Sequence, residues 1–275
     1  MAFENLGGSA LDYYPCRYGK SKLLFRGPKR KLDQPYLAVL GGTETYGKFC
    51  AKPYPALLEE QLDFSAVNLG CVNAGVDVFA NEQAIADICS NARVTVVEIT
   101  GAQNLSNRFY AVHPRRNDRF LRASNLLKTI YREVDFSDIN FTRHLLKVLW
   151  EASPDKFAMV EAELKEAWTA RMKRLISNFE GKVVLLWLAD HAPGAPTAFT
   201  PDDPDPLLVD RDMIEMLRPF VAGIAEVVVD QAEIVQGRAG LIHGEVEAPV
   251  AAELLGTCAH DKAAAALAEI VRPLL

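Results

Sequence analysis

Small polar side chains follow three apolar runs of this sequence, and hydroxyl and amide groups placed in this way could act in catalysis or in ligand binding. The first run, YLAVLGGTETYGKF over residues 36–49, ends in two glycines followed by Thr43. A hydroxyl can attack a carbonyl carbon when a nearby base takes its proton, and neighbouring amides can stabilise the resulting oxyanion. The other residues placed in this way are Gly42, Glu44, Thr45, Gly70, Asn73, Gln103 and Asn104.

Two histidines could supply the base. His191 follows Asp190 at the end of an apolar run, and His260 precedes an alanine-rich closing segment. Each also has a structural interpretation, His191 as part of a solvated strand exit and His260 as a locally satisfied helix-start residue. Thr43 could equally cap a helix through its hydroxyl, and Glu44 could be an acid or base or an exposed helix-start carboxylate.

A basic segment follows the third apolar run. The stretch GAQNLSNRFYAVHPRRNDRFLRAS contains Arg108, His113, Arg115 and Arg116 among its cations, with Asp118 opposing them. Arginine forks bind carboxylate, sulfate or phosphate in a bidentate manner. We interpret the segment as a loop that binds an anionic part of a substrate; the alternative is a surface loop that pairs with the acidic remainder of the chain.

The spacing of apolar runs predicts the elements that position these residues. Short continuous runs, which indicate strands covered on both faces, alternate with helical patterns, as in parallel sheets with right-handed crossovers. We therefore predict a three-layer α/β/α sandwich with a five-stranded parallel, flavodoxin-like sheet, whose ligand site lies at the carboxyl ends of the strands. The predicted strands are 36–41, 66–70, 93–100, 182–190 and 224–230, and the predicted helices are 54–62, 81–90, 141–151, 157–179 and 261–275.

The chain divides into a basic N-terminal arm over 1–35 and a single α/β domain over 36–275 with a helical insertion at about 105–180. The arm is expected to lie on the surface of the domain, or alternatively to close over an anionic ligand or line an oligomer contact. Segment 193–206 reads as a proline-rich surface loop.

The order of the polar blocks resembles the SGNH, or GDSL-like, hydrolase and acyltransferase superfamily. GGTETYG at 41–47 is similar to its G-D-S-x-T-x-G block, NLGCVNAG at 68–75 to its N-x-G-x-x-G-x-G block, and GAQN at 101–104 to its G-x-N-D block. TCAH at 257–260 stands where the superfamily has D-x-x-H. The resemblance implies that Thr43 replaces the nucleophilic serine, that Asn73, Gln103 and Asn104 form the polar hole, and that His260 is the base. Gly42 and Thr257 replace two aspartates of the pattern, so the catalytic blocks are degenerate.

Composition narrows the class of protein. The 275 residues are 49% hydrophobic and 24% charged with a net charge of −6, which favours a globular protein and disfavours a general nucleic-acid binder. The five cysteines are scattered without metal-ligand spacing, so we expect free thiols and neither a metal nor another cofactor.

The N-terminal residues lack a signal-peptide pattern, and no apolar run could span a bilayer, so a cytoplasmic location is expected.

These observations predict an esterase or acyltransferase that acts on a polar substrate with an anionic group or a carbohydrate, and that could form homo-oligomers. Two alternatives stay open. One is a sulfuryl or phosphoryl-type transferase that neutralises charge with arginines, and the other is a catalytically inactive protein that binds a ligand or a glycan.

Overall fold

The computed structural model describes residues 11–194 and 199–275, and it contains the predicted central sheet. The strand order is β2-β1-β3-β6-β7, and every neighbouring pair is parallel. This is the flavodoxin-like order, so the predicted fold class is confirmed. The strands are β1 (Leu37–Leu40), β2 (Ala66–Asn68), β3 (Val94–Glu98), β6 (Lys182–Ala189) and β7 (Gly223–Val228).

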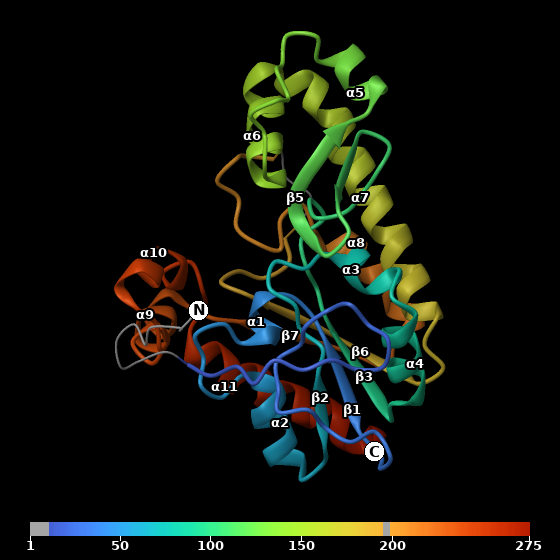
Figure 1. Cartoon of the computed structure of the whole chain (residues 1–275), viewed down its shortest axis with the longest axis vertical. Helices are drawn as coiled ribbons and strands as arrows, with labels where there is room; N and C mark the ends of the chain where they lie inside the picture. The colour runs from blue at the N-terminus through green and yellow to red at the C-terminus, as the bar shows by residue number, and fades with distance from the viewer. Residues whose placement is uncertain (1–10, 195–198) are drawn as a thin grey trace, which may run out of the picture.

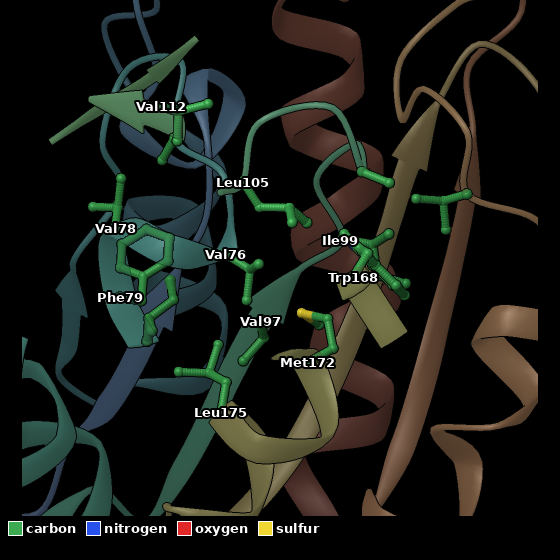
Figure 2. Close-up of a cluster of buried hydrophobic side chains, with 14 of the residues drawn as sticks. Val76, Val78, Phe79, Val97, Ile99, Leu105, Val112, Trp168, Met172 and Leu175 are labelled. Carbon is green, nitrogen blue, oxygen red and sulfur yellow. The ribbon is translucent and has the colours of Figure 1, made fainter. Parts of the chain in front are cut away.

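Helices cover both faces of the sheet (Figure 1). One face packs against α2 (Tyr54–Leu62), α9 (Gln231–Arg238) and α11 (Thr257–Val271). The other packs against α3 (Val76–Ala80), α4 (Gln83–Asn91) and α7 (Pro154–Ser177). Figure 2 shows side chains of α3 and α7, among them Trp168 and Met172, around Val97 and Ile99 at the end of β3. Strands buried on both faces explain why their sequences read as continuous apolar runs.

The insertion between β3 and β6 is partly a β-hairpin, which the sequence analysis did not predict. The segment interpreted as a charged loop forms β4 (Tyr110–His113) and β5 (Arg116–Ala123), which pair antiparallel with two register shifts. Those irregularities and the many charges disturb the alternation that identifies a strand. The helices α5 (Asn125–Ile130), α6 (Thr142–Ala152) and α7 complete the lobe at the top of Figure 1.

One apolar residue of the long helix α7 lies outside the core. Met159 is 48% exposed, whereas Phe157 and Val160 are buried. The buried residues of α7 follow the helical period from Phe157 through Leu164 and Trp168 to Ile176, and Met159 falls on the opposite face of the helix.

The N-terminal arm is built into the core from residue 11 onward, and residues 1–10 lie outside the described part. Tyr18, Leu23 and Phe25 are buried. Arg26, expected among solvated cations, is only 7% exposed and donates hydrogen bonds to the carbonyls of Tyr46, Gly47 and Ala51. The arm therefore holds the chain that follows β1, which corrects the expectation of a segment merely lying on the surface. The prediction of no signal peptide rests partly on residues 1–10 and is not tested.

The remaining short elements complete the chain. They are α1 (Thr43–Tyr46), α8 (Arg211–Glu215), α10 (Ala248–Ala251) and the 3₁₀ turns Arg218–Phe220, Glu245–Glu247 and Arg272–Leu274. Within the predicted loop 193–206, residues 195–198 lie outside the described part. Among the described residues, no helix combines the length and apolar character needed to cross a membrane.

Candidate functional site at the carboxyl ends of the strands

Thr43 is the first residue of α1, directly after β1, and its hydroxyl is held by Asn73. The hydroxyl donates to Asn73 Oδ1 at 3.1 Å and accepts from the Asn73 backbone N–H at 3.0 Å. The N-cap of α1 is Gly42, so Thr43 does not cap its own helix. Asn73 has a left-handed backbone with φ of 55°, a conformation that asparagine tolerates better than most residues. The structure therefore brings together one predicted pair of site residues, Thr43 and Asn73.

The turn that carries Thr43 is anchored by Glu98, a residue that the sequence analysis did not single out. Glu98 ends β3, is buried, and accepts hydrogen bonds from the backbone N–H groups of Gly42 at 2.9 Å and Thr45 at 3.1 Å and from the Thr45 hydroxyl. Burial raises the pKa of the Glu98 carboxyl. In the sequence, the only indication that Glu98 anchors this turn is that a charged residue ends the otherwise apolar run RVTVVE.

Thr45 is beneath the site and does not line it. Its side chain is fully buried, and its hydroxyl also lies 2.6 Å from the Tyr54 hydroxyl. This corrects the prediction that Thr45 binds substrate, because no ligand can reach a hydroxyl enclosed in this way.

Of the two predicted glycines at this edge, only Gly70 allows a close approach of the chain. A Cβ on Gly70 would lie 2.3 Å from the backbone nitrogen of Tyr46, which no side chain could tolerate. A Cβ on Gly42 would lie 3.5 Å from Thr100 Cγ2, an ordinary contact. Gly70 is therefore required for packing, whereas Gly42 only lines the turn.

The side-chain hydrogen bonds of Gln103 and Asn104 are with residues other than Thr43 and Asn73. The Gln103 side-chain amide donates to Asp205 at 3.1 Å, and Asn104 accepts from the Thr142 hydroxyl at 2.6 Å. Gln103 is 4% exposed, and its Oε1 has no hydrogen-bond partner among the described residues. The predicted polar hole of three amides stays a prediction, because the side-chain contacts of the two later amides are with the inserted lobe and the loop before α8.

The buried His260 pairs with Glu44 of α1, whose side chain is 14% exposed. The His260 ring is 1% exposed, its Nδ1 accepts from the Tyr54 backbone N–H at 3.3 Å, and its Nε2 lies 3.5 Å from Glu44 Oε2. Glu44 also accepts from the Leu255 backbone N–H at 3.0 Å. Burial lowers the pKa of His260 to about 4 and raises that of Glu44 to about 7. Both nitrogens of His260 face partners other than Thr43, so its role as base stays a prediction without a contact to support it.

Asp190 and His191 form a second pair at the end of β6. His191 Nδ1 lies 2.7 Å from Asp190 Oδ1, and the two side chains are 35% and 32% exposed. The edge of the His191 ring faces Trp187, whose indole N–H donates to the His191 carbonyl at 2.8 Å. A carboxylate that accepts from Nδ1–H leaves Nε2 as a proton acceptor, which is the arrangement that a general base requires.

The basic hairpin lies against the loop that holds Asn73. Asp118 accepts from Asn73 Nδ2 at 3.2 Å, and the buried Asn117 accepts from the backbone N–H groups of Gly75 and Val78. Neither Asn117 nor Asp118 was predicted, because their partners lie about 40 residues away in the sequence. The hairpin therefore borders the Thr43 site.

The predicted basic residues differ in their surroundings. Arg108 pairs with Glu163 at 2.6 Å, and His113 Nδ1 accepts from the Arg115 backbone N–H at 3.2 Å. Arg115 and Arg116 are exposed and make no ion pair with any described residue.

Three cavities are found elsewhere on the molecule. One of about 640 Å³ lies at the amino ends of β1 and β3, where Tyr36 and Arg93 line it. The other two, of about 290 and 440 Å³, border the N-terminal arm. Among the described residues, no group of three or more His, Cys, Asp or Glu side chains has the arrangement of a metal site.

Comparisons with known proteins identify the family. The model of the family described as Domain of unknown function (DUF6473) matches residues 1–275, so the chain belongs to that family. No curated protein matches the chain. Similar solved structures include an extracellular lipase from Streptomyces rimosus, 13% identical over 88% of this chain and 100% of that chain, with a TM-score of 0.47. A gut microbial diltiazem-metabolizing enzyme is 11% identical over 80% of this chain and 41% of that chain, with a TM-score of 0.31.

Proposed function

We propose that this member of the DUF6473 family hydrolyses an ester or transfers its acyl group at the edge of the sheet where Thr43 lies. Thr43 is the hydroxyl that meets the acyl group, and Asp190–His191 is the pair that moves the proton. The observation that carries the proposal is the 2.7 Å contact between Asp190 and His191 at the same sheet edge as the Asn73-held hydroxyl.

The reaction assigned to this edge has two reactants, the ester and either water or an acceptor alcohol. His191 Nε2 takes the proton of the attacking hydroxyl, a bond forms from that oxygen to the acyl carbon, and the ester C–O bond breaks as the leaving oxygen receives the proton. Asp190 stabilises the imidazolium that forms in between. When Thr43 attacks, its proton reaches His191 through an intervening water or substrate hydroxyl, and water or an acceptor alcohol then attacks the acyl-enzyme and releases Thr43. When water or the acceptor alcohol attacks the ester directly, the Thr43 hydroxyl donates to the oxyanion.

The order of the strands determines how far Thr43 lies from His191. Thr43 follows β1 and His191 follows β6, with β3 between them. Neighbouring strands lie about 4.8 Å apart, so the two strands are separated by roughly 10 Å. A direct hydrogen bond between Thr43 and His191 is not among the contacts of the described residues, and a substrate hydroxyl or a water has to occupy the space between them.

The test is hydrolysis of a panel of aryl and alkyl esters by the wild-type chain and by Thr43→Ala and Thr43→Ser. We expect kcat/KM to fall in Thr43→Ala by about 100-fold or more with an unchanged melting temperature, and to be retained in Thr43→Ser. Mass spectrometry of the enzyme during turnover distinguishes the two routes, since only attack by Thr43 adds an acyl group to residue 43. An inert wild-type chain across the panel would overturn the proposal.

One observation favours a second function, that of a ligand-binding protein without catalysis. The Thr43 hydroxyl is engaged on both its donor and acceptor sides by Asn73, and His260 is closed off by Tyr54 and Glu44. If ligand binding survives Thr43→Ala and His191→Ala while turnover is absent from the wild type, this second function is the correct one.

A further inference from the structure

The tip of the β4–β5 hairpin carries two arginines that form no ion pair with any residue the structure describes. We propose that Arg115 and Arg116 bind an oxoanion group of the substrate, such as a phosphate, sulfate or carboxylate, beside the Thr43 site. The substrate class rests on the proposed function, but binding of the anion itself does not require turnover.

Two other cations in or next to the hairpin have structural partners, whereas Arg122 in β5 is exposed. Arg108 pairs with Glu163, and Arg119 lies over the ring of Phe141 at 4.3 Å. Arg115 and Arg116, at the turn between the strands, are exposed and have no carboxylate within ion-pair distance in the described part of the chain. Two adjacent unpaired arginines on a chain of net charge −6 are the feature that an anionic ligand would explain.

The tip is held rigidly. Asn117 is fully buried, accepts from Gly75 N–H at 3.2 Å and Val78 N–H at 3.0 Å, and donates to the His113 carbonyl at 3.0 Å. With the Arg115 N–H bound to His113 Nδ1, the backbone on both sides of Arg116 is fixed. A site fixed before binding loses less conformational entropy when the ligand arrives.

The same strand directs the tip toward Thr43. Asp118 contacts Asn73, which holds the Thr43 hydroxyl. Arg116 precedes Asp118 by two residues in β5, so the backbones of the two residues are about 7 Å apart. The Asp118 carboxylate is engaged by Asn73 at 3.2 Å. An anion on the two guanidinium groups would therefore lie within one substrate length of the Thr43 hydroxyl.

Arginine is suited to this task. Its planar fork binds two oxygens of a carboxylate, sulfate or phosphate at once, and it stays charged at every physiological pH. Hydrogen bonds to charged groups are also stronger than those between neutral groups. Removing both arginines is therefore expected to weaken binding of an oxoanion by about tenfold or more.

The experiment is isothermal titration calorimetry with inorganic phosphate, sulfate and acetate at constant ionic strength. The proteins compared are the wild type, Arg115→Ala/Arg116→Ala and the matched control Arg122→Ala/Arg132→Ala, which removes two other exposed arginines. We expect one site in the wild type and the control, and at least about tenfold weaker binding in the Arg115/Arg116 variant. The relative affinities of the three anions identify the group that the site prefers.

Three outcomes would overturn the proposal: no binding to the wild type, equal binding to the Arg115/Arg116 variant, or equal loss in the control. Thr43→Ala is included because it separates this proposal from the proposed reaction. We expect it to bind the anion as the wild type does, so a failed ester assay with intact anion binding rejects only the reaction. A final comparison of neutral and anionic esters of one acyl group should show a kcat/KM preference that Arg115→Ala/Arg116→Ala removes.

Discussion

The molecule contains two histidine–carboxylate pairs near the same end of its sheet, and they differ in burial. His260 faces Glu44 with its side chain 2% exposed, whereas His191 faces Asp190 with its side chain 35% exposed. The first histidine has both nitrogens directed at protein groups, and the second keeps Nε2 available. The comparison teaches that a motif position does not make a base, because the base also needs an open nitrogen and access to substrate.

The largest expected effect separates the two pairs by kinetics. If His191 is the base, His191→Ala should lower kcat by about 10²- to 10⁴-fold, while His260→Gln should leave kcat within a few-fold of the wild type. Added imidazole should partly restore activity to His191→Ala only. The comparison fails if His260→Gln, shown to be folded by circular dichroism, is the inactive variant.

The next effect concerns how the free energy of unfolding depends on pH. The pKa of His260 is lowered to about 4, so its contribution to stability is present above its ordinary value of about 6.5 and is lost as the pH falls toward 4. The pKa of Glu44 is raised to about 7, so its contribution is present below about 4.5 and is lost as the pH rises toward 7. In the wild type these opposite slopes offset each other between about pH 4.5 and 6.5.

Single variants should reveal each slope. Glu44→Gln removes the contribution that the wild type loses as the pH rises. The unfolding free energy of the variant relative to that of the wild type should therefore rise with pH, by up to about 3 kcal/mol between pH 4 and 7. His260→Gln should show the reverse trend. Urea denaturation at a series of pH values measures both, and difference curves that are flat for both variants would contradict the burial of the pair.

The rates at which a chemical reagent modifies His191 and His260 should also differ, and this is a third and smaller effect. Diethyl pyrocarbonate should modify His191 in the native protein at least about tenfold faster than His260, because the reagent reaches only exposed imidazoles and a side chain 2% exposed requires local unfolding. The exposed His144 serves as the internal reference. Peptide mass spectrometry over time gives the rates, and equal rates for His191 and His260 would show that the second pair opens readily.

The smallest expected effect tests the layer beneath Thr43. Tyr54→Phe removes the hydroxyl that lies 2.6 Å from the Thr45 hydroxyl but keeps the ring beside His260. It should lower the unfolding free energy by about 1 kcal/mol and leave kcat unchanged. Tyr14→Phe, at an exposed position, is the control. A large loss of activity would mean that the buried pair participates in the reaction.

The elements of the sheet could be predicted because their signals are local. The predicted helix over 54–62 is α2, and the apolar runs around residues 37, 67 and 95 are strands. Local signals also placed Thr43 and Asn73 at the same sheet edge, since the carboxyl ends of parallel strands meet there.

The rest of the site depended on contacts between distant segments. Tyr54 and His260 are 206 residues apart, and Asn73 and Asp118 are 45 apart. The hairpin was missed because its register shifts break the alternation of side chains. Glu98, Asn117 and Asp118 were missed because no local pattern marks a carboxylate or amide whose partners come from another loop.

By itself the sequence determined the parallel sheet, its order of elements and the edge at which polar groups gather, because apolar periodicity and strand-end chemistry are properties of neighbouring residues. The tertiary structure alone decided which histidine is enclosed and which is open, and which arginines lack partners. Burial and pairing depend on what the folded chain brings alongside each side chain. His260 is neutral under α1 because α11 packs there, and His191 keeps one nitrogen free because it lies where β6 ends.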